Sequence, residues 1–232
     1  AGATAIGASA AVTMNASAQL KNEPPSGKPF VDQYYEGMLK IAKDLRANQI
    51  DTIAKSMTTA YDCIQKGGKV HARFQTGHFV MFAASSDVPG QPNIFPNTRG
   101  ENSEMAKGDF LLCMGGNQQA RDKGIFVTGV TNSYTITKKT PEGALARSGK
   151  PMEDSCDMVI DSQQPWQNGL VNVPWITTFH VMPSCGNAMM LVYWSCTASL
   201  ANLIGTKGKG SAAAPAEQYL DLAIERIQML GT

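Results

Sequence analysis

Apolar positions recur along the chain every three or four residues in three separate stretches. They do so in residues 30–45, 50–64 and 216–230, and this spacing predicts amphipathic helices. Residues 184–203 are apolar on nearly all sides, which predicts a long helix that lies centrally in the fold or at an interface. Gly67 and Gly68 follow the second stretch and are typical of a helix C-terminus.

Short apolar runs between these helices predict the strands of a buried sheet. The runs are 69–74, 110–114, 125–130 and 158–160, with a further extended piece near 170–173. A helix of about two turns or fewer is expected in the sequence QQARDK, which follows the second run. Because strands alternate with helices, the pattern predicts an α/β fold with a doubly wound, mainly parallel sheet and helices on both faces.

The first 18 residues, AGATAIGASAAVTMNASA, differ from the rest because they are small and carry no charge. They end in a small-x-small pattern before Gln19, which predicts a cleaved signal segment and export to the periplasm or cell envelope. The segment resembles twin-arginine export signals in its weak hydrophobicity. A retained arm that docks on a neighbouring subunit and a cytoplasmic location are the alternatives. We expect a linker at 19–29, a domain at 30–205, a linker at 206–215 and a C-terminal helix at 216–232.

Charge and cysteine content exclude several classes of function. The chain has 20 basic and 19 acidic residues, so nothing in its charge balance favours nucleic acid as a partner. The densest basic stretch, TKGKG at 206–210, is typical of a solvated linker. Five widely spaced cysteines without a C-x-x-C pair predict no zinc site, and we expect no metal or cofactor. Their odd number argues against a full disulfide framework and leaves a single bridge open.

Four stretches of the chain resemble the SIS (sugar isomerase) domain family, in particular its small members that are similar to phosphoheptose isomerase. The stretches are IQKGGKVHARFQTGHF, KGDFLLCMGGN, KGIFVTGVTNSYTITKKTPEGALARSGKPMEDSCDMVID and VMPSCGNAMMLVYWSCTASLANLI. Their order and spacing carry the likeness, which covers residues 32–205. The resemblance implies a fold that binds phosphorylated sugars and that pairs as a homodimer or larger homo-oligomer.

The chain departs from the family at positions where the family commonly has hydroxyl groups. The family's second loop usually carries Ser-x-Ser-Gly, which binds the sugar phosphate at a helix N-terminus, whereas this chain has Met114–Asn117 there. Phe79 stands where a serine is common, and Ser184–Gly186 stand where threonine and serine are common. The resemblance therefore implies a degenerate phosphate loop.

The candidate ligand site lies in the loops that leave the predicted strands, because α/β folds bind ligands at the carboxyl ends of their strands. The backbone N–H groups of Gly115 and Gly116 could bind an anion, and Asn117 could cap the short helix that follows. The alternative is that these residues form an ordinary tight turn. The expected ligand-binding residues are Thr76, Gly77, Gly115, Gly116, Asn117, Thr131, Ser133 and Ser184.

Isomerisation of a sugar phosphate needs a base beside the reacting carbon. His78 is the main candidate for this base, and Glu104, Asp87 and His180 are weaker candidates. The alternative is that His78 only forms a hydrogen bond to a neighbouring loop. His71, inside a predicted strand, is interpreted as structural.

Two functions follow from these patterns. The first is a protein that binds a sugar phosphate or another small anion, with isomerase activity left open. The second is an exported, non-catalytic assembly protein that uses the fold to form oligomers.

Overall fold

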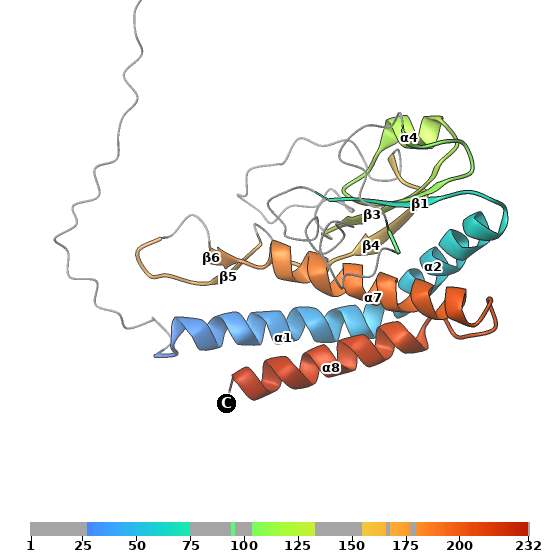
Figure 1. Ribbon diagram of the computed structural model, residues 1–232. Coiled ribbons are helices and arrows are strands. Elements are labelled where there is room, and N and C mark those ends of the chain that lie inside the picture. Colours follow the sequence, from blue (N-terminus) through green and yellow to red (C-terminus); the bar gives the residue numbers. More distant parts are fainter. Residues whose placement is uncertain are drawn as a thin grey trace, which may run out of the picture.

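Within the part of the chain that the structure describes, four parallel strands form a central sheet (Figure 1). The structure is a computed structural model, and it describes residues 27–74, 94–95, 104–132, 155–165, 168–176 and 180–231. The strands are β1 (Val70–Arg73), β2 (Phe110–Met114), β3 (Phe126–Thr131) and β4 (Met158–Asp161), and they lie side by side in this order. The predicted α/β class and parallel sheet are confirmed, and the arrangement is compatible with a doubly wound fold.

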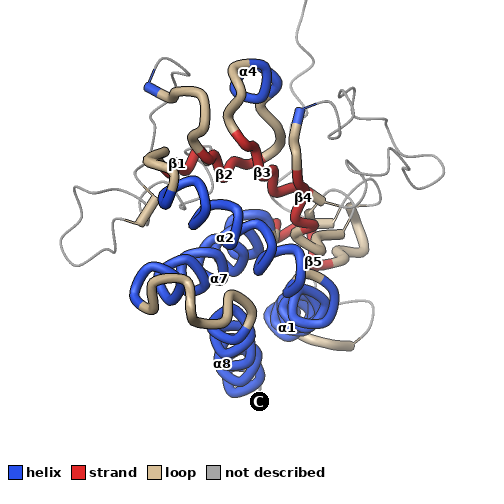
Figure 2. The backbone as a smooth tube through the Cα atoms, turned by 90° about the vertical axis from the view of Figure 1, so that its right-hand side faces the viewer, coloured by secondary structure: helices blue, strands red, loops and turns tan. Residues whose placement is uncertain are grey.

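The described helices lie on the two sides of this sheet in unequal numbers (Figure 2). They are α1 (Phe30–Asn48), α2 (Ile50–Gln65), α4 (Gln118–Asp122), α7 (Cys185–Gly205) and α8 (Ala214–Leu230). Helices α2 and α7 pack beneath the sheet, α1 and α8 form a further layer below them, and α4 lies on the opposite side. The helices expected from apolar spacing are confirmed, with ends that differ from the prediction by a few residues.

The side chains of the strands belong to two apolar clusters, one on each face of the sheet, because successive residues of a strand point to opposite faces. Ala72, Phe110 and Leu112 point toward the large cluster that contains α1, α2, α7 and α8. Leu111, Cys113 and Val127 point toward a smaller cluster beneath α4. Both faces of the sheet are therefore covered, which explains why the strand sequences are continuously apolar.

Helix α7 is apolar on nearly all sides because the fold surrounds it. Its neighbours are α2, α1 and α8, and Val192, Tyr193 and Cys196 on it are fully buried. Among the described residues it is the helix whose length and composition would suit a membrane span, but 61% of that stretch is buried inside the fold. Of the two positions expected from its sequence, central or at an interface, the structure shows the central one.

A small antiparallel sheet was only half predicted from the sequence. Strand β5 (Gly169–Val171) matches the expected extended piece, and it pairs with β6 (Val181–Pro183), which the sequence pattern did not indicate. A side chain at Gly169 would collide with the backbone of His180, so only glycine permits this close pairing. The first half of α1 packs on β5, where Gly37 contacts Leu170.

A buried pair, His71 and Asp109, joins β1 to the turn before β2. Asp109 accepts hydrogen bonds from the N–H groups of Lys69 and Ala106, at 2.8 and 2.9 Å, and its Oδ2 lies 3.0 Å from His71 Nε2. Burial acts to raise the pKa of Asp109, but these three hydrogen bonds together outweigh it and hold the pKa below its ordinary value. The structural role expected for His71 agrees with this contact.

Asp109→Asn should lower the free energy of unfolding by about 2 kcal/mol at neutral pH, because it weakens several hydrogen bonds to a buried carboxylate. The unfolded chain binds this proton with a pKa of about 3.9, above the folded value, so the ionised group stabilises the fold above that pH. The difference between wild type and variant should therefore be complete above about pH 5 and shrink as the pH falls below 4. Urea unfolding measured from pH 3 to pH 7 tests this, and a difference that grows toward acid pH would contradict it.

Candidate functional site

The carboxyl ends of β1–β4 meet at one edge of the sheet, here called the carboxyl edge. Helix α2 begins at this edge, because the side chain of Gln49 accepts a hydrogen bond from the N–H group of Asp161 at the end of β4. Helix α7 runs in the same direction as α2, because the loop after α7 packs at Gly208 against Tyr61 in the last turns of α2. The N-terminus of α7 thus points to the carboxyl edge, as Figure 1 shows.

The corner after β2 is tightly built from protein groups. The N–H group of Gly115 donates to the carbonyl of Val130, and that of Asn117 donates to the carbonyl of Ser155, both at 2.9 Å. Ser155 and Cys156 also fill the space where a side chain at Gly116 would lie. Two of the three N–H groups at this corner, those of Gly115 and Asn117, are therefore already bonded to protein carbonyls, so the corner is less open than its sequence indicates.

Asn117 caps the short helix α4, as expected from the sequence. Its Oδ1 atom accepts a hydrogen bond from the N–H group of Ala120 at 3.0 Å. This bond satisfies one of the N–H groups that a helix leaves unpaired at its start. The cap therefore ties the corner after β2 to the helix that follows it.

The other described candidates lie in different places. Thr131 ends β3 at the carboxyl edge, and its carbonyl accepts two hydrogen bonds from Ser162. Ser184 is fully buried, and its hydroxyl donates to the carbonyl of Asn168 at 2.9 Å. Glu104 is exposed and precedes β2 at the opposite edge of the sheet, and His180 is exposed beside β6. The structure therefore does not bring Glu104 to the carboxyl edge.

Several predictions fall outside the described residues. These are the base candidate His78 with Asp87, the ligand-binding candidates Thr76, Gly77 and Ser133, and the signal-like segment 1–18.

The connection from β4 to α7 holds polar groups that the sequence patterns did not single out. Gln164 is 4% exposed and its Nε2 atom has no hydrogen-bond partner, and Asn168 Oδ1 is likewise buried and unpartnered. Gln163, Asn168 and Met182 in this connection all have positive φ, between 55° and 64°. Such backbone strain in residues other than glycine is common at ligand sites. The polar run DSQQPWQNG, directly after a buried strand, was the available signal in the sequence.

An aromatic group supports the end of β1, where the chain leaves toward residue 75. The ring of Tyr193 on α7 contacts Phe74, Phe95 and Trp194 with centroid distances of 5.9, 6.2 and 5.2 Å. Burial raises the pKa of the Tyr193 hydroxyl, and the nearby Thr197 hydroxyl opposes this rise to a smaller extent. The two hydroxyl groups do not form a hydrogen bond with each other. This group fixes the position at which β1 reaches the carboxyl edge.

The five cysteines are free thiols. Cys113 and Cys156 both contact the carbonyl oxygen of Gly115, with sulfur–oxygen distances of 3.5 and 3.7 Å. Burial raises the pKa of both thiols, that of Cys156 to about 11, so neither is an activated nucleophile. The described part of the chain also contains no cluster of three or more His, Cys, Asp or Glu residues that would hold a metal ion.

No protein-family model matches the chain, and no curated protein sequence matches it.

Gly116→Ala should destabilise the protein by about 1–3 kcal/mol, because the added methyl group collides with Ser155. Ser155→Gly in the same chain removes the colliding atoms and should restore part of the lost stability, as measured by urea unfolding. Gly115→Ala is the matched control, since its φ of 73° is strained but no atom lies near the added group. Rescue of Gly115→Ala by Ser155→Gly, or no effect of Gly116→Ala, would show that this corner is packed differently.

Proposed function

We propose that this chain is a phosphosugar-binding protein of the SIS type, with its ligand at the carboxyl edge against the connection from β4 to α7. The all-parallel sheet and the long helix α7 after the last parallel strand support this assignment. The ligand class is a phosphorylated sugar or a chemically similar small anion.

The buried amide of Gln164 carries the proposal. A buried N–H group without an acceptor costs about 1–3 kcal/mol, so such groups are rare unless a ligand or water bonds to them. The unpartnered Oδ1 atom of Asn168 adds an acceptor four residues later. A donor and an acceptor in one polar connection fit a ligand that carries phosphate oxygens and sugar hydroxyls.

The N-terminus of α7 supplies the positive charge that such a ligand requires. Ser184 precedes the helix without capping it, because its hydroxyl bonds to Asn168 instead. The first N–H groups of a helix lack partners within the helix and carry a partial positive charge, which attracts phosphate. Because Asn168 bonds directly to Ser184, the polar connection and the start of α7 adjoin each other.

The proposed phosphate position differs from that of the family's Ser-x-Ser-Gly loop. At the corresponding corner, the N–H groups of Gly115 and Asn117 already bond to protein carbonyls. The anchor therefore shifts in this proposal from the β2 corner toward α7 and the β4 connection. This shift accounts for the loss of hydroxyl residues from the loop.

Catalysis in this proposal depends on His78, which comes five residues after the end of β1 in the sequence. An isomerase moves a proton between adjacent carbons and needs a base within hydrogen-bond reach of them. Remote binding of the phosphate holds the reacting end of the sugar in place. Binding and turnover are therefore separate properties, and each has its own experiment.

The apolar sequence of α7 no longer favours the hypothesis of an assembly protein. The apolar sequence of α7 was expected to suit either a central position or an interface, and contacts with α1, α2 and α8 account for it within one chain. Homo-oligomerisation and export remain proposals that accompany the binding function.

Gln164→Leu should leave the unliganded protein as stable as the wild type or more so, because it removes a buried unpartnered amide. The same change should weaken binding of the ligand by about 10- to 100-fold, the effect of losing a hydrogen bond to a charged group. Thermal-shift titrations with aldose and ketose phosphates measure both properties, with inorganic phosphate and unphosphorylated sugars as comparisons.

Gln218→Leu is the control for this experiment, because Gln218 is an exposed glutamine on α8. It should leave the ligand-induced shift unchanged. If Gln164→Leu lowers stability and leaves the shift intact, Gln164 has a structural role. The ligand class is wrong if no sugar phosphate stabilises the wild type.

His78→Ala should abolish interconversion of the bound aldose and ketose phosphates, because it removes the base. The thermal shift should persist, since His78 is not assigned to phosphate binding. A coupled assay of ketose phosphate formation tests this, and undiminished turnover in the variant would exclude His78 as the base.

A further inference from the structure

Lysine–glycine pairs occur at four turns along the chain. The first pairs at these turns are Lys66–Gly67, Lys107–Gly108, Lys123–Gly124 and Lys207–Gly208, and the last turn also contains Lys209–Gly210. The glycine of each first pair has a positive φ, between 78° and 91°, which glycine adopts without strain. Three of these four first pairs follow the C-termini of α2, α4 and α7, and the fourth precedes β2.

The fold brings these turns together at the amino edge of the sheet, opposite the carboxyl edge. The turn at Gly68 packs directly against the carbonyl of Gly108, and the N–H group of Gly108 donates to the carbonyl of Gly124 at 3.1 Å. The turn after α7 joins them through Tyr61, because a side chain at Gly208 would lie 2.8 Å from that ring. Turns that are far apart in sequence therefore form one continuous surface, here called the lysine end.

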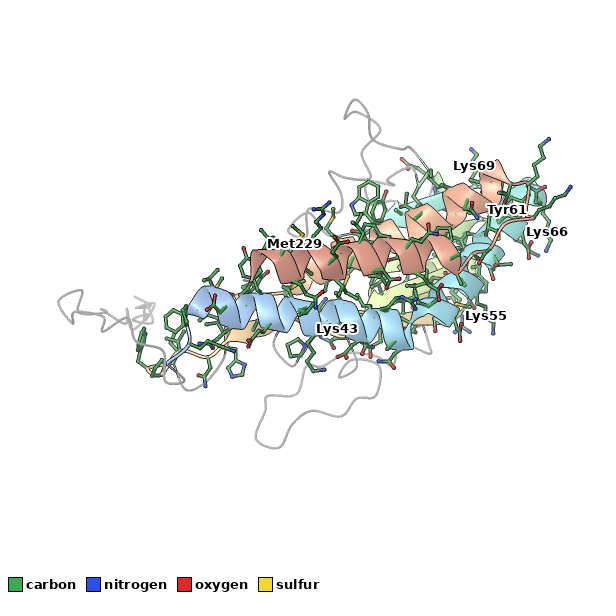
Figure 3. All side chains as sticks on the ribbon, turned by 90° about the horizontal axis from the view of Figure 1, so that it is seen from below. Lys43, Lys55, Tyr61, Lys66, Lys69 and Met229 are labelled. Atoms are coloured by element: carbon green, nitrogen blue, oxygen red, sulfur yellow. The ribbon has the colours of Figure 1, made fainter. Side chains whose placement is uncertain are left out.

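The lysine end carries an excess of positive charge. Its exposed lysines are Lys66, Lys69, Lys107, Lys123, Lys207 and Lys209. The exposed carboxylates at this edge are Asp62, Glu104, Asp122 and Asp157; Gln118 bonds to Asp122, and Arg121 pairs with Asp157. Exposed lysines thus outnumber exposed carboxylates at this end, and Figure 3 shows Lys66 and Lys69 projecting from it beside Tyr61.

Helix dipoles account for only some of these lysines. The C-terminus of a helix carries a partial negative charge that a nearby cation stabilises, which explains Lys66, Lys123 and Lys207. Lys69 directly precedes β1, Lys107 lies three residues before β2, and Lys209 lies further along the turn before α8. Lys66, Lys69, Lys207 and Lys209 form no ion pair with any described residue. The excess charge is therefore available to a partner.

We infer that the lysine end docks on an anionic lipid bilayer. The six exposed cations are lysines, and the half-buried Arg121 at this end is paired with Asp157. The hydrated point charge of lysine suits the diffuse field of lipid headgroups better than the paired hydrogen bonds that arginine makes to single phosphates. Ile204, 45% exposed in the last turn of α7, lies three residues before Lys207 and offers an apolar side chain to the headgroup region. Nucleic-acid surfaces more often combine cations with stacking aromatic rings or arginine.

This docking orients the molecule. The carboxyl edge lies at the other end of the strands and would face away from the bilayer, toward solution. The ligand site and the lysine end are independent surfaces, so each can fail without the other.

Flotation of the full chain with vesicles tests the inference. Wild type should bind phosphatidylcholine vesicles that contain about one third phosphatidylglycerol, should not bind pure phosphatidylcholine, and should dissociate in high salt. Each lysine near an anionic surface contributes about fivefold to the partition coefficient, so Lys66→Gln/Lys69→Gln should lower it by about 25-fold.

Lys40→Gln/Lys43→Gln is the matched control, because it removes the same charge from α1. Lys40 pairs with Asp44 on an exposed helix face, a contact whose loss has little effect on stability. The control should bind within about twofold of the wild type, since its lysines lie outside the docking surface. Equal losses in both variants would show that only net charge matters, and the inference would be overturned.

Two further results would overturn it. One is failure of the wild type to bind anionic vesicles at low salt. The other is tighter binding to a double-stranded DNA fragment that depends on Lys66 and Lys69 in the same way, which would make nucleic acid the partner.

Discussion

The parallel pairing of β1 to β4 is the constraint on which the rest of the structure depends. Because the four strands run in one direction, their carboxyl ends meet at one edge and their amino ends at the other. Helices α2, α4 and α7 return in the opposite direction, so their N-termini point to the carboxyl edge and their C-termini to the amino edge. The two edges therefore differ in electrostatic character before any side chain is considered.

In the proposals made above, each edge has its own binding role. At the carboxyl edge, the uncapped start of α7 and the buried amide of Gln164 favour an anionic ligand with hydroxyl groups. At the amino edge, lysines follow three helix C-termini and exceed what those termini require. Ligand binding and surface docking can thus occupy opposite ends of one domain without competing for residues.

Most of the fold was predictable from the sequence because its elements bury whole faces. Apolar spacing located α1, α2, α7 and α8, and the run at 110–114 coincides with β2. Strand β6 was missed because it has three residues, contains a proline and includes Met182 at positive φ. It is stabilised by pairing with β5 rather than by any pattern of its own.

The candidate site was less predictable because it depends on contacts between distant segments. The cap at Asn117 is local and followed from residue type, whereas the N–H groups of Gly115 and Asn117 are engaged by Val130 and Ser155. The burial of Gln164 and the grouping of the lysine–glycine turns likewise arise only when the strands are assembled. Residue type indicated what these groups can bond to, and the fold decides which of them have partners.

A crystal structure of the protein with a bound sugar phosphate tests the central claim most directly. The account predicts that the phosphate lies at the start of α7, with a ligand oxygen within hydrogen-bond distance of Gln164 Nε2. A ligand held at the corner of Gly115 and Gly116, or a Gln164 amide that bonds only to protein groups, would contradict it.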